Sequence, residues 1–279
     1  MTGVLRYSAF DVDGAGGNPA GVVLDAGGLS DAEMLAVAAD LGYSESAFVT
    51  AADGPALRIR FFSPLAEVAF CGHATIATAV AYAERHGPGE LRLATGAGEV
   101  LVGTVPVGGR ILATLTSVPP SVREPGNGIV SAALAALRWD ATDLDPALPP
   151  RIGFAGNDHL VLAAASRGRL ADLRYDEPAL GALMAEQKWT TVQLVWRESP
   201  DVFHARDPFP PGGVYEDPAT GAAAAAFGAY LRDLGLVTPP ARVTIHQGED
   251  MGRPSLLLVD IPPGTAGIGV SGTATLLRL

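Results

Sequence analysis

Residues that could transfer protons lie next to one another in the sequence, at the start of a predicted apolar helix. The chain's single cysteine, Cys71, is followed by Gly72 and His73, and an alanine-rich run predicts a helix over 73–86. A helix that is apolar all round belongs in a protein interior. Its first N–H groups offer hydrogen bonds and partial positive charge to an anion, and a thiol placed there is activated. The sequence therefore predicts a buried helix whose N-terminal end faces an acidic small molecule.

Two carboxylates are further candidates for proton transfer. Glu45 lies between a helix stop at Gly42 and an apolar strand, where partial desolvation would make it a usable proton carrier near neutral pH. A solvated loop glutamate is the plainer interpretation, and position alone favours it. Asp217 comes shortly before a second alanine-rich helix, expected over 220–235, which either Asp217 or Thr220 would cap.

The amino-acid composition narrows the possible classes of protein. The 279 residues are 48% hydrophobic and 18% charged, as in a soluble globular protein, and the net charge of −11 argues against a nucleic-acid partner. One cysteine excludes an internal disulfide, and the five histidines show no metal-ligand spacing, so no metal is expected. The N-terminus lacks a signal pattern, and no apolar run is long enough to span a membrane. We therefore expect a cytoplasmic protein with no membrane partner.

The order of elements repeats along the chain, which indicates two similar halves. A Pro- and Gly-rich break over 119–128 divides the chain into residues 1–118 and 128–279, and the last strand is allowed to return to the first half. Each half leads through a strand and a Pro turn to an apolar helix, with Arg60 aligned on His204. Any α/β chain shows some such order, but two all-apolar helices favour duplication. The predicted fold is α/β with mixed sheets, each half being a sheet rolled around a central apolar helix.

The spacing of hydrophobic residues and the helix-capping residues predict where helices and strands begin and end. Ser30 begins a capping box ahead of a helix that ends at Gly42. Strands are expected over residues 3–10, 20–24, 47–50, 57–62, 91–95, 98–105, 110–117 and 191–195, and a short helix over 129–137. Two such halves would bring two helix N-termini to one cleft, a preferred place for a ligand.

A set of motifs runs in order along nearly the whole chain. They are Gly17-Asn-Pro19, Gly42-Tyr-Ser-Glu45-Ser-Ala-Phe48, Arg60-Phe-Phe-Ser-Pro64, Glu67-Val-Ala-Phe-Cys-Gly-His-Ala-Thr75 and Glu216-Asp-Pro-Ala-Thr-Gly221. Together they resemble the phenazine-biosynthesis (PhzF-like) isomerase family, which shares the diaminopimelate epimerase fold. The last two motifs are highly specific as a pair.

The resemblance implies a cofactor-independent isomerase, typically a homodimer, that acts on a small carboxylic acid such as 2,3-dihydro-3-hydroxyanthranilate. In such enzymes a glutamate, here Glu45, moves a proton between carbons of a conjugated system. A histidine and an aspartate, here His73 and Asp217, assist the transfer. The substrate-binding positions that the motifs carry over are Asn18, Ser44, Cys71, Gly72, Ala74, Thr220, Gly221 and Ala222.

One position departs from the family pattern. The last motif usually continues with a serine that contacts the substrate, whereas this chain has Ala222. A lost hydrogen bond to a charged group costs about 1.5–3 kcal/mol, which predicts a different substrate or weaker activity on the family's named one. Two alternatives stay open: a non-catalytic protein that binds small acids, and a one-thiol dehydratase or racemase centred on Cys71. A two-thiol mechanism is excluded because the chain has only one cysteine.

Overall fold

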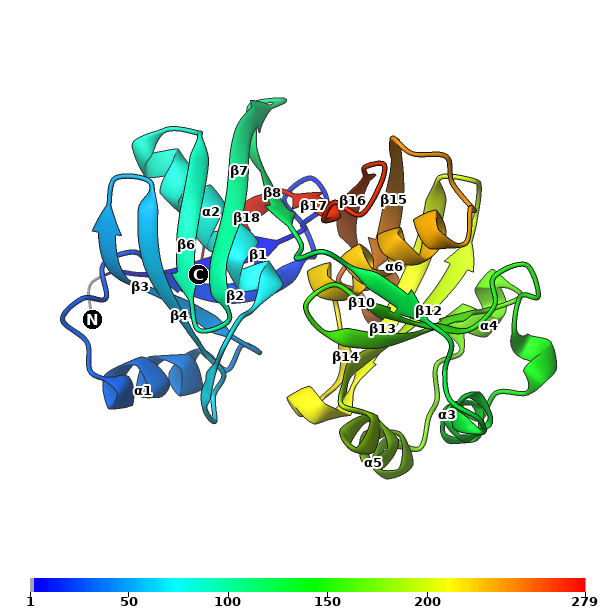
Figure 1. Cartoon of the computed structure of the whole chain (residues 1–279). Coiled ribbons are helices and arrows are strands. Elements are labelled where there is room, and N and C mark those ends of the chain that lie inside the picture. The colour runs from blue at the N-terminus through cyan, green and yellow to red at the C-terminus, as the bar shows by residue number, and fades with distance from the viewer. Residues whose placement is uncertain (1–2, 279) are drawn as a thin grey trace. The chain divides into compact units, whose positions relative to one another are not determined.

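The chain forms two compact units in a computed structural model that describes residues 3–278 (Figure 1). The first unit comprises Met1–Thr116 and Ser271–Leu279, and the second comprises Ser117–Val270. The C-terminal end of the chain thus belongs to the first unit. The segment expected as a connection at 119–128 contains a strand, β9 (Ser121–Arg123), which pairs with the second unit's sheet.

The first unit is a mixed sheet with one helix inside it. Its elements are β1 (Val4–Ala9), β2 (Asn18–Val23), α1 (Asp31–Leu41), β3 (Ser46–Asp53), β4 (Ala56–Phe62), β5 (Glu67–Val68), α2 (Gly72–His86), β6 (Glu90–Thr95), β7 (Gly98–Val107), β8 (Arg110–Thr116) and β18 (Ala274–Leu276). The strand order is β18-β1-β2-β3-β4-β6-β7-β8, with β2–β3 and β4–β6 parallel and the other pairs antiparallel. Parallel neighbours need crossover connections, and α1 and α2 supply them.

The second unit repeats this plan. Its elements are β9, α3 (Ile129–Leu137), η1 (Ala141–Asp143), β10 (Arg151–Phe154), β11 (Asp158–Ala163), α4 (Arg167–Ala171), α5 (Glu177–Gln187), β12 (Trp189–Arg197), β13 (Val202–Phe209), η2 (Pro210–Gly212), β14 (Val214–Asp217), α6 (Gly221–Asp233), β15 (Ala241–Gln247), η3 (Glu249–Met251) and β16 (Ser255–Ile261). Strand β17 (Gly269–Gly272) spans the point where the chain passes back to the first unit.

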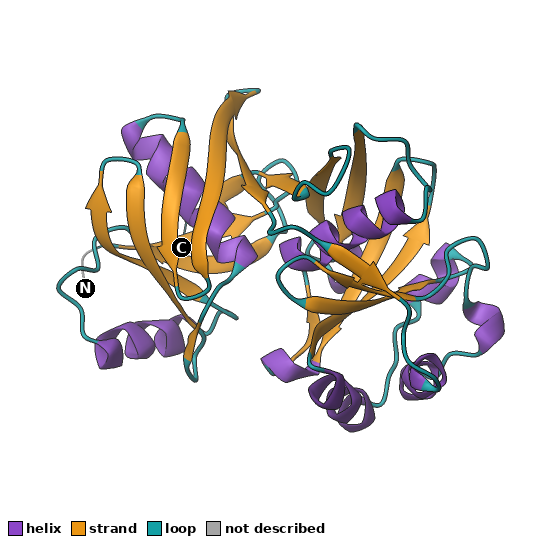
Figure 2. Ribbon diagram, in the orientation of Figure 1, coloured by secondary structure: helices purple, strands orange, loops and turns teal. Residues whose placement is uncertain are grey.

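The pairing pattern confirms the predicted duplication. In the first unit, β1, β2, β3, β4, β6 and β7 pair in the sequence antiparallel, parallel, antiparallel, parallel, antiparallel. In the second unit, β10, β11, β12, β13, β15 and β16 pair in the same sequence. The short strands β5 and β14 each fold back on the strand before them, and an apolar helix follows each (Figure 2). The predicted fold class of two pseudo-symmetric halves is therefore confirmed.

Ion pairs at the two turns correct one detail of the predicted repeat. Arg60 of β4 makes a two-pronged pair with Glu67 of β5, and Arg206 of β13 makes the same pair with Glu216 of β14. Arg60 therefore corresponds to Arg206 and not to His204. Because the two halves have low sequence identity, an alignment of their sequences misses this difference. The residue pairing between the strands shows the correct correspondence.

Helices α2 and α6 form the interiors of the two units. All residues of 73–81 and of 223–231 are buried, which confirms the prediction made from their apolar composition. Their small side chains let the strands approach closely: a Cβ atom on Gly228 would lie 2.8 Å from the Val259 side chain. Helix α2 begins one residue earlier than predicted. Helix α6 covers Gly221–Asp233, which is shorter than the predicted 220–235 because Thr220 is its N-cap and Leu234 its C-cap.

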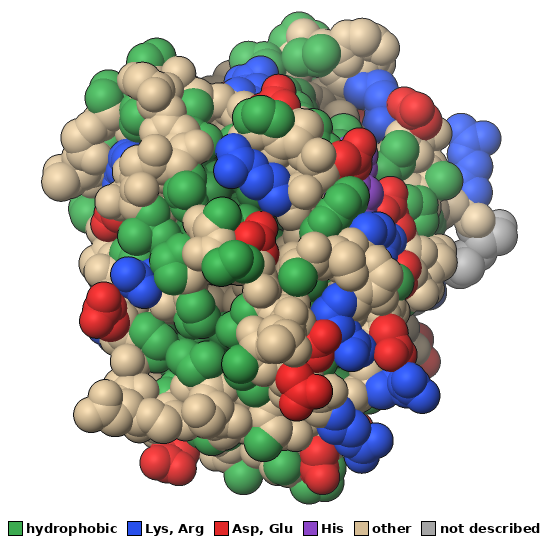
Figure 3. All heavy atoms as spheres, turned by 90° about the vertical axis from the view of Figure 1, so that its right-hand side faces the viewer, with side chains coloured by type: hydrophobic (Ala, Val, Ile, Leu, Met, Phe, Trp, Pro, Cys, Tyr) green, Lys and Arg blue, Asp and Glu red, His purple; other side chains and the backbone are tan. Residues whose placement is uncertain are grey.

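Helix α1 agrees closely with its local sequence signals. The Ser30 side chain caps α1 in a capping box with Glu33, and Gly42 ends the helix in a left-handed conformation. Within residues 3–278, none of the helices combines the length and apolarity needed to cross a membrane. On the face of the molecule shown in Figure 3, acidic and basic side chains are interspersed with apolar ones.

Candidate active site

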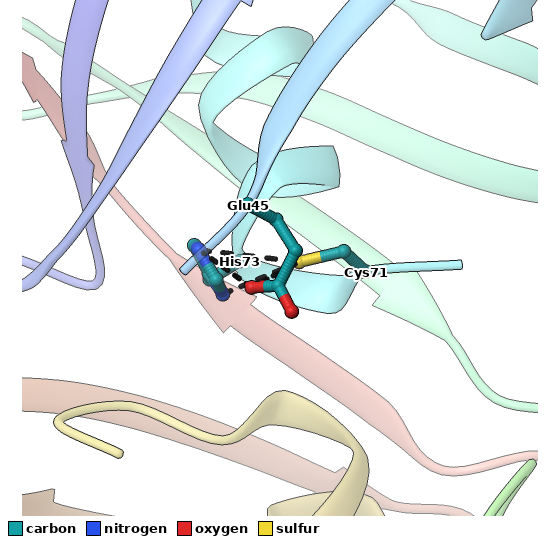
Figure 4. A group of neighbouring side chains, drawn as sticks. All are labelled: Glu45, Cys71 and His73. Atoms are coloured by element: carbon teal, nitrogen blue, oxygen red, sulfur yellow. Dashed lines mark hydrogen bonds and ion pairs between the residues drawn. The ribbon is translucent and has the colours of Figure 1, made fainter. Parts of the chain in front are cut away.

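Three side chains of the first unit meet at the N-terminal end of α2. The Cys71 thiol donates to Oε2 of Glu45 at 3.6 Å, and its Sγ atom lies 3.3 Å from Nδ1 of His73. Nε2 of His73 lies 3.7 Å from the same Glu45 oxygen (Figure 4). A carboxylate, a thiol and an imidazole thus form one contiguous group.

The sheet brings these residues together although they are distant in sequence. Ser46, next to Glu45, lies opposite Phe62 in β3 and β4, and Phe62 lies opposite Glu67 in β5. The start of β3 and the short strand before α2 therefore share one end of the sheet. Gly42 ends α1 immediately before this point and turns the chain toward β3.

The group combines one partly accessible residue with two buried ones. The Glu45 side chain is 17% exposed and the His73 side chain 6% exposed. Burial lowers the pKa of His73, while the Glu45 charge and a hydrogen bond to the Pro19 carbonyl oppose that shift. The imidazole is therefore neutral at pH 7, so one ring nitrogen keeps a lone pair beside the thiol and the carboxylate.

Asp217 lies in the second unit, where hydrogen bonds hold it at the start of α6. The Thr220 hydroxyl donates to Oδ2 of Asp217 at 2.6 Å. The Gln247 amide donates to the Asp217 carbonyl and to the Thr220 hydroxyl, and Gln247 Oε1 accepts from the Thr220 backbone N–H. Gln247 was not predicted, because only the pairing of β13 with β15 brings this strand end to α6.

A buried acid behind Asp217 was also missed. Asp207 lies directly opposite Asp217 in β13 and β14, and its side chain is fully buried. Burial and the neighbouring Asp217 charge raise the pKa of Asp207 well above its usual range. The Thr191 hydroxyl donates to Asp207 at 3.2 Å and lies 2.8 Å from Nδ1 of buried His159. The sequence signal for it was weak, because β13 also carries the polar residues His204 and Arg206.

The other predicted site residues fall into the same two groups. Ser44, Gly72 and Ala74 adjoin the Glu45 group, with the Ser44 hydroxyl 3.5 Å from Nε2 of His73. Asn18 begins β2 and is buried beside Pro19, whose carbonyl bonds His73. Gly221 and Ala222 open α6 beyond Thr220, and Ala222 is half-buried.

Glu45, Cys71 and His73 are close enough together to bind one metal ion. One ligand atom from each of Glu45, Cys71 and His73 lies within 4.8 Å of the others. The expectation of no metal site was based on spacing along the sequence, and these donors are gathered by the fold instead.

Comparisons with known proteins identify the family and agree with the fold. The phenazine biosynthesis-like protein family matches residues 7–278. The chain is 30% identical to an uncharacterized isomerase, YddE, of Escherichia coli K12, over 98% of this chain and 96% of that protein. It is 31% identical to the trans-2,3-dihydro-3-hydroxyanthranilate isomerase of Pseudomonas fluorescens, over 86% of this chain and 84% of that protein.

Solved structures show the same relationship. A Bacillus anthracis phenazine biosynthesis protein of the PhzF family superposes with a TM-score of 0.88 at 25% identity, over 99% of this chain and 96% of that one. A probable proline racemase from Agrobacterium radiobacter, 14% identical, shares the fold with a TM-score of 0.66 over 99% of this chain and 92% of that one. The fold is thus shared with a racemase, and the family match and the named relatives define the chain as an isomerase. The chain belongs to the phenazine biosynthesis-like (PhzF) family.

Proposed function

We propose that this isomerase moves a proton between two carbons of a small unsaturated carboxylic acid, and that Glu45 carries the proton. The position of the Glu45 carboxylate is the observation that supports this most directly. It is partly accessible, yet it lies against the thiol of Cys71 and the neutral imidazole of His73. A carboxylate in such a partly desolvated place is a suitable general base.

The proposed reaction needs no change of oxidation state. The Glu45 carboxylate takes a proton from a carbon next to the unsaturated system, and the electron pair of that C–H bond delocalises over the substrate. The resulting carboxylic acid returns the proton to another carbon of the same system. One C–H bond breaks and one forms, and Glu45 ends as it began.

Two further groups are proposed to support this transfer. Neutral His73 can donate or accept a hydrogen bond as charge develops on the substrate, and Asp217 is proposed as the second assisting group. The first N–H groups of a helix have no intrahelical partner, so the start of α2 at Gly72 suits a carboxylate. Asp217 ends β14, the short strand that precedes α6 in the second unit.

The substrate class follows from the relatives and from Ala222. One relative is named for a dihydro-hydroxyanthranilate, an unsaturated ring acid. The family's serine is Ala222 here, which removes one hydroxyl donor from the start of α6. We therefore propose an unsaturated carboxylic acid with one fewer hydrogen-bond acceptor at that point. An Ala222→Ser variant is expected to improve activity on the hydroxyanthranilate-type acid.

The test is turnover of a panel of unsaturated carboxylic acids, followed by NMR in D2O. Active enzyme should move hydrogen between carbons, with deuterium entering from solvent unless the transfer is wholly internal. Glu45→Gln should lower kcat by about 10²–10⁴-fold, the usual contribution of a general acid–base group. Glu90→Gln, at an exposed position of β6, is the matched control and should keep full activity. Full turnover by Glu45→Gln would refute the role.

A second candidate function is supported by the Cys71–His73 contact. A thiol 3.3 Å from an imidazole nitrogen is itself an acid–base pair, which a one-thiol dehydratase or racemase would use. Under this alternative Cys71→Ala would abolish activity and Glu45→Gln would only weaken it. The opposite ranking of the two variants selects the glutamate mechanism.

A further inference from the structure

We propose that Glu45, Cys71 and His73 form a zinc site, and that a bound Zn²⁺ ion stops the isomerase by occupying Glu45. The binding part of this proposal depends only on the geometry of the three side chains. The inhibition part rests on the proposed function of Glu45.

The separations between the three donors match those around tetrahedral zinc. With usual zinc–ligand bond lengths, neighbouring S, N and O donors lie about 3.4–3.6 Å apart. Here Sγ of Cys71 is 3.6 Å from Oε2 of Glu45, and that oxygen is 3.7 Å from Nε2 of His73. Sγ is 3.3 Å from Nδ1 and 3.9 Å from Nε2 of the same ring. Shifts of a few tenths of an ångström would place all three donors on one ion.

The donor types and their support are also those of a zinc site. Thiolate, imidazole and carboxylate are the ligands that zinc takes in proteins. The Pro19 carbonyl accepts a hydrogen bond from the His73 ring, which leaves the other ring nitrogen for the ion. A backbone carbonyl of this kind commonly orients the ring of a metal-binding histidine. A thiol-containing set also disfavours Mg²⁺ and Ca²⁺, which prefer all-oxygen sites.

Three protein ligands leave one position of the ion open. Zinc sites that bind small molecules have this arrangement, with water or a ligand in the fourth position. The 17% exposed Glu45 side chain provides contact with solvent, while Cys71 and His73 are buried. A small carboxylate could therefore occupy the fourth position, but Glu45, bound to the ion, could no longer take a proton from it.

Binding requires the Cys71 thiol to lose its proton. The S–H bond breaks, the thiolate electron pair bonds to zinc, and the proton passes to solvent. Zinc keeps its oxidation state throughout, so removing the ion with a chelator and reprotonating the thiol restores the original site. The block is therefore reversible.

Cobalt tests the site without any substrate. The metal-free full-length chain, titrated with Co²⁺, should bind one equivalent and develop the near-ultraviolet charge-transfer band of a thiolate–cobalt bond together with the visible bands of tetrahedral cobalt. Zn²⁺ should displace the cobalt, and Mg²⁺ should not. Cys71→Ser should lose the charge-transfer band, and Glu45→Gln should keep the band while binding at least about tenfold more weakly.

A matched control and an activity assay complete the test. His86→Gln, at the exposed end of the same helix, should bind cobalt like the parent chain. Absence of the band in the parent chain, or its persistence in Cys71→Ser, would overturn the site. With a turned-over substrate, stoichiometric Zn²⁺ should abolish the rate and EDTA should restore it. Binding of zinc without loss of rate would overturn the inhibition while leaving the metal site in place.

Discussion

The starts of α2 and α6 occupy the same place in two copies of one fold, yet they carry different chemistry. At the start of α2, a carboxylate, a thiol and an imidazole touch one another, and Glu45 among them reaches solvent. At the start of α6, hydrogen bonds from Thr220 fix the carboxylate of Asp217, and Gln247 fixes its backbone. The two units therefore share a topology, and the side chains at each helix start differ in exposure and in hydrogen bonding.

The strands behind the two helices differ in the same way. Phe61 of β4 lies opposite Val68, and its ring packs edge-on against Phe70. The corresponding pair in the second unit is Asp207 opposite Asp217. One copy closes this end of its sheet with apolar side chains. The other places two acids there, and burial raises the pKa of one of them, Asp207, well above its usual range, which favours its neutral form.

The largest expected effect is an unequal loss of activity on neutralising the two carboxylates. Glu45→Gln should lower kcat by about 10²–10⁴-fold because it removes the group that we propose carries the proton. Asp217→Asn should cost less, since an amide can still accept the Thr220 hydrogen bond. Steady-state kinetics of both variants on one substrate makes the comparison. If Asp217→Asn proves the more damaging, the reactive group lies at α6 instead.

The two arginine–glutamate pairs should differ strongly in stability. The Arg206 and Glu216 side chains are 9% and 3% exposed, against 26% and 44% for Arg60 and Glu67. Arg206→Ala leaves a buried charge without its partner and should cost about 3–5 kcal/mol of unfolding free energy. Arg60→Ala should cost about 1 kcal/mol or less. Urea denaturation measures both, and equal costs would contradict the difference in burial.

Buried His159 should make the second unit sensitive to acid. Burial lowers its pKa to about 4, whereas an unfolded histidine titrates near 6.5. As the pH falls between these values, only the unfolded chain gains the proton, so the free energy of unfolding falls by about 3 kcal/mol. His159→Gln should flatten this decline, and exposed His86→Gln should not. Denaturant titrations from pH 7 to pH 4 test this, and an unchanged decline in His159→Gln would count against it.

A smaller effect of opposite sign is expected at Asp207. The pKa of the Asp207 carboxyl is raised in the folded chain. At low pH this carboxyl is neutral in both the folded and the unfolded chain, and as the pH rises it ionises first in the unfolded chain. The free energy of unfolding therefore falls as the pH rises. Asp207→Asn should raise Tm, more at pH 8 than at pH 4, while Asp201→Asn at an exposed position should not. A lower Tm for Asp207→Asn at pH 8 would mean that the carboxyl is ionised.

Much of the fold could be predicted, and the candidate site only in part. The Ser30 capping box, the Gly42 stop and both apolar helices agree with prediction. Glu45 was selected through its motif, since its position alone favoured a solvated loop. Gln247 and Asp207 were missed because their neighbours come from other strands. The match of Arg60 to His204 failed because the repeat was aligned without strand register.

The sequence by itself determined what depends on residues a few positions apart. Helix caps, the apolar composition of α2 and the motifs around Glu45 and Asp217 are of this kind, because their interactions close within one or two turns of chain. The tertiary structure decided what depends on contact and burial. It placed the Cys71 thiol against a carboxylate 26 residues away, made His73 neutral, and set Asp207 opposite Asp217. These properties arise from desolvation and cross-strand pairing, which no local pattern encodes.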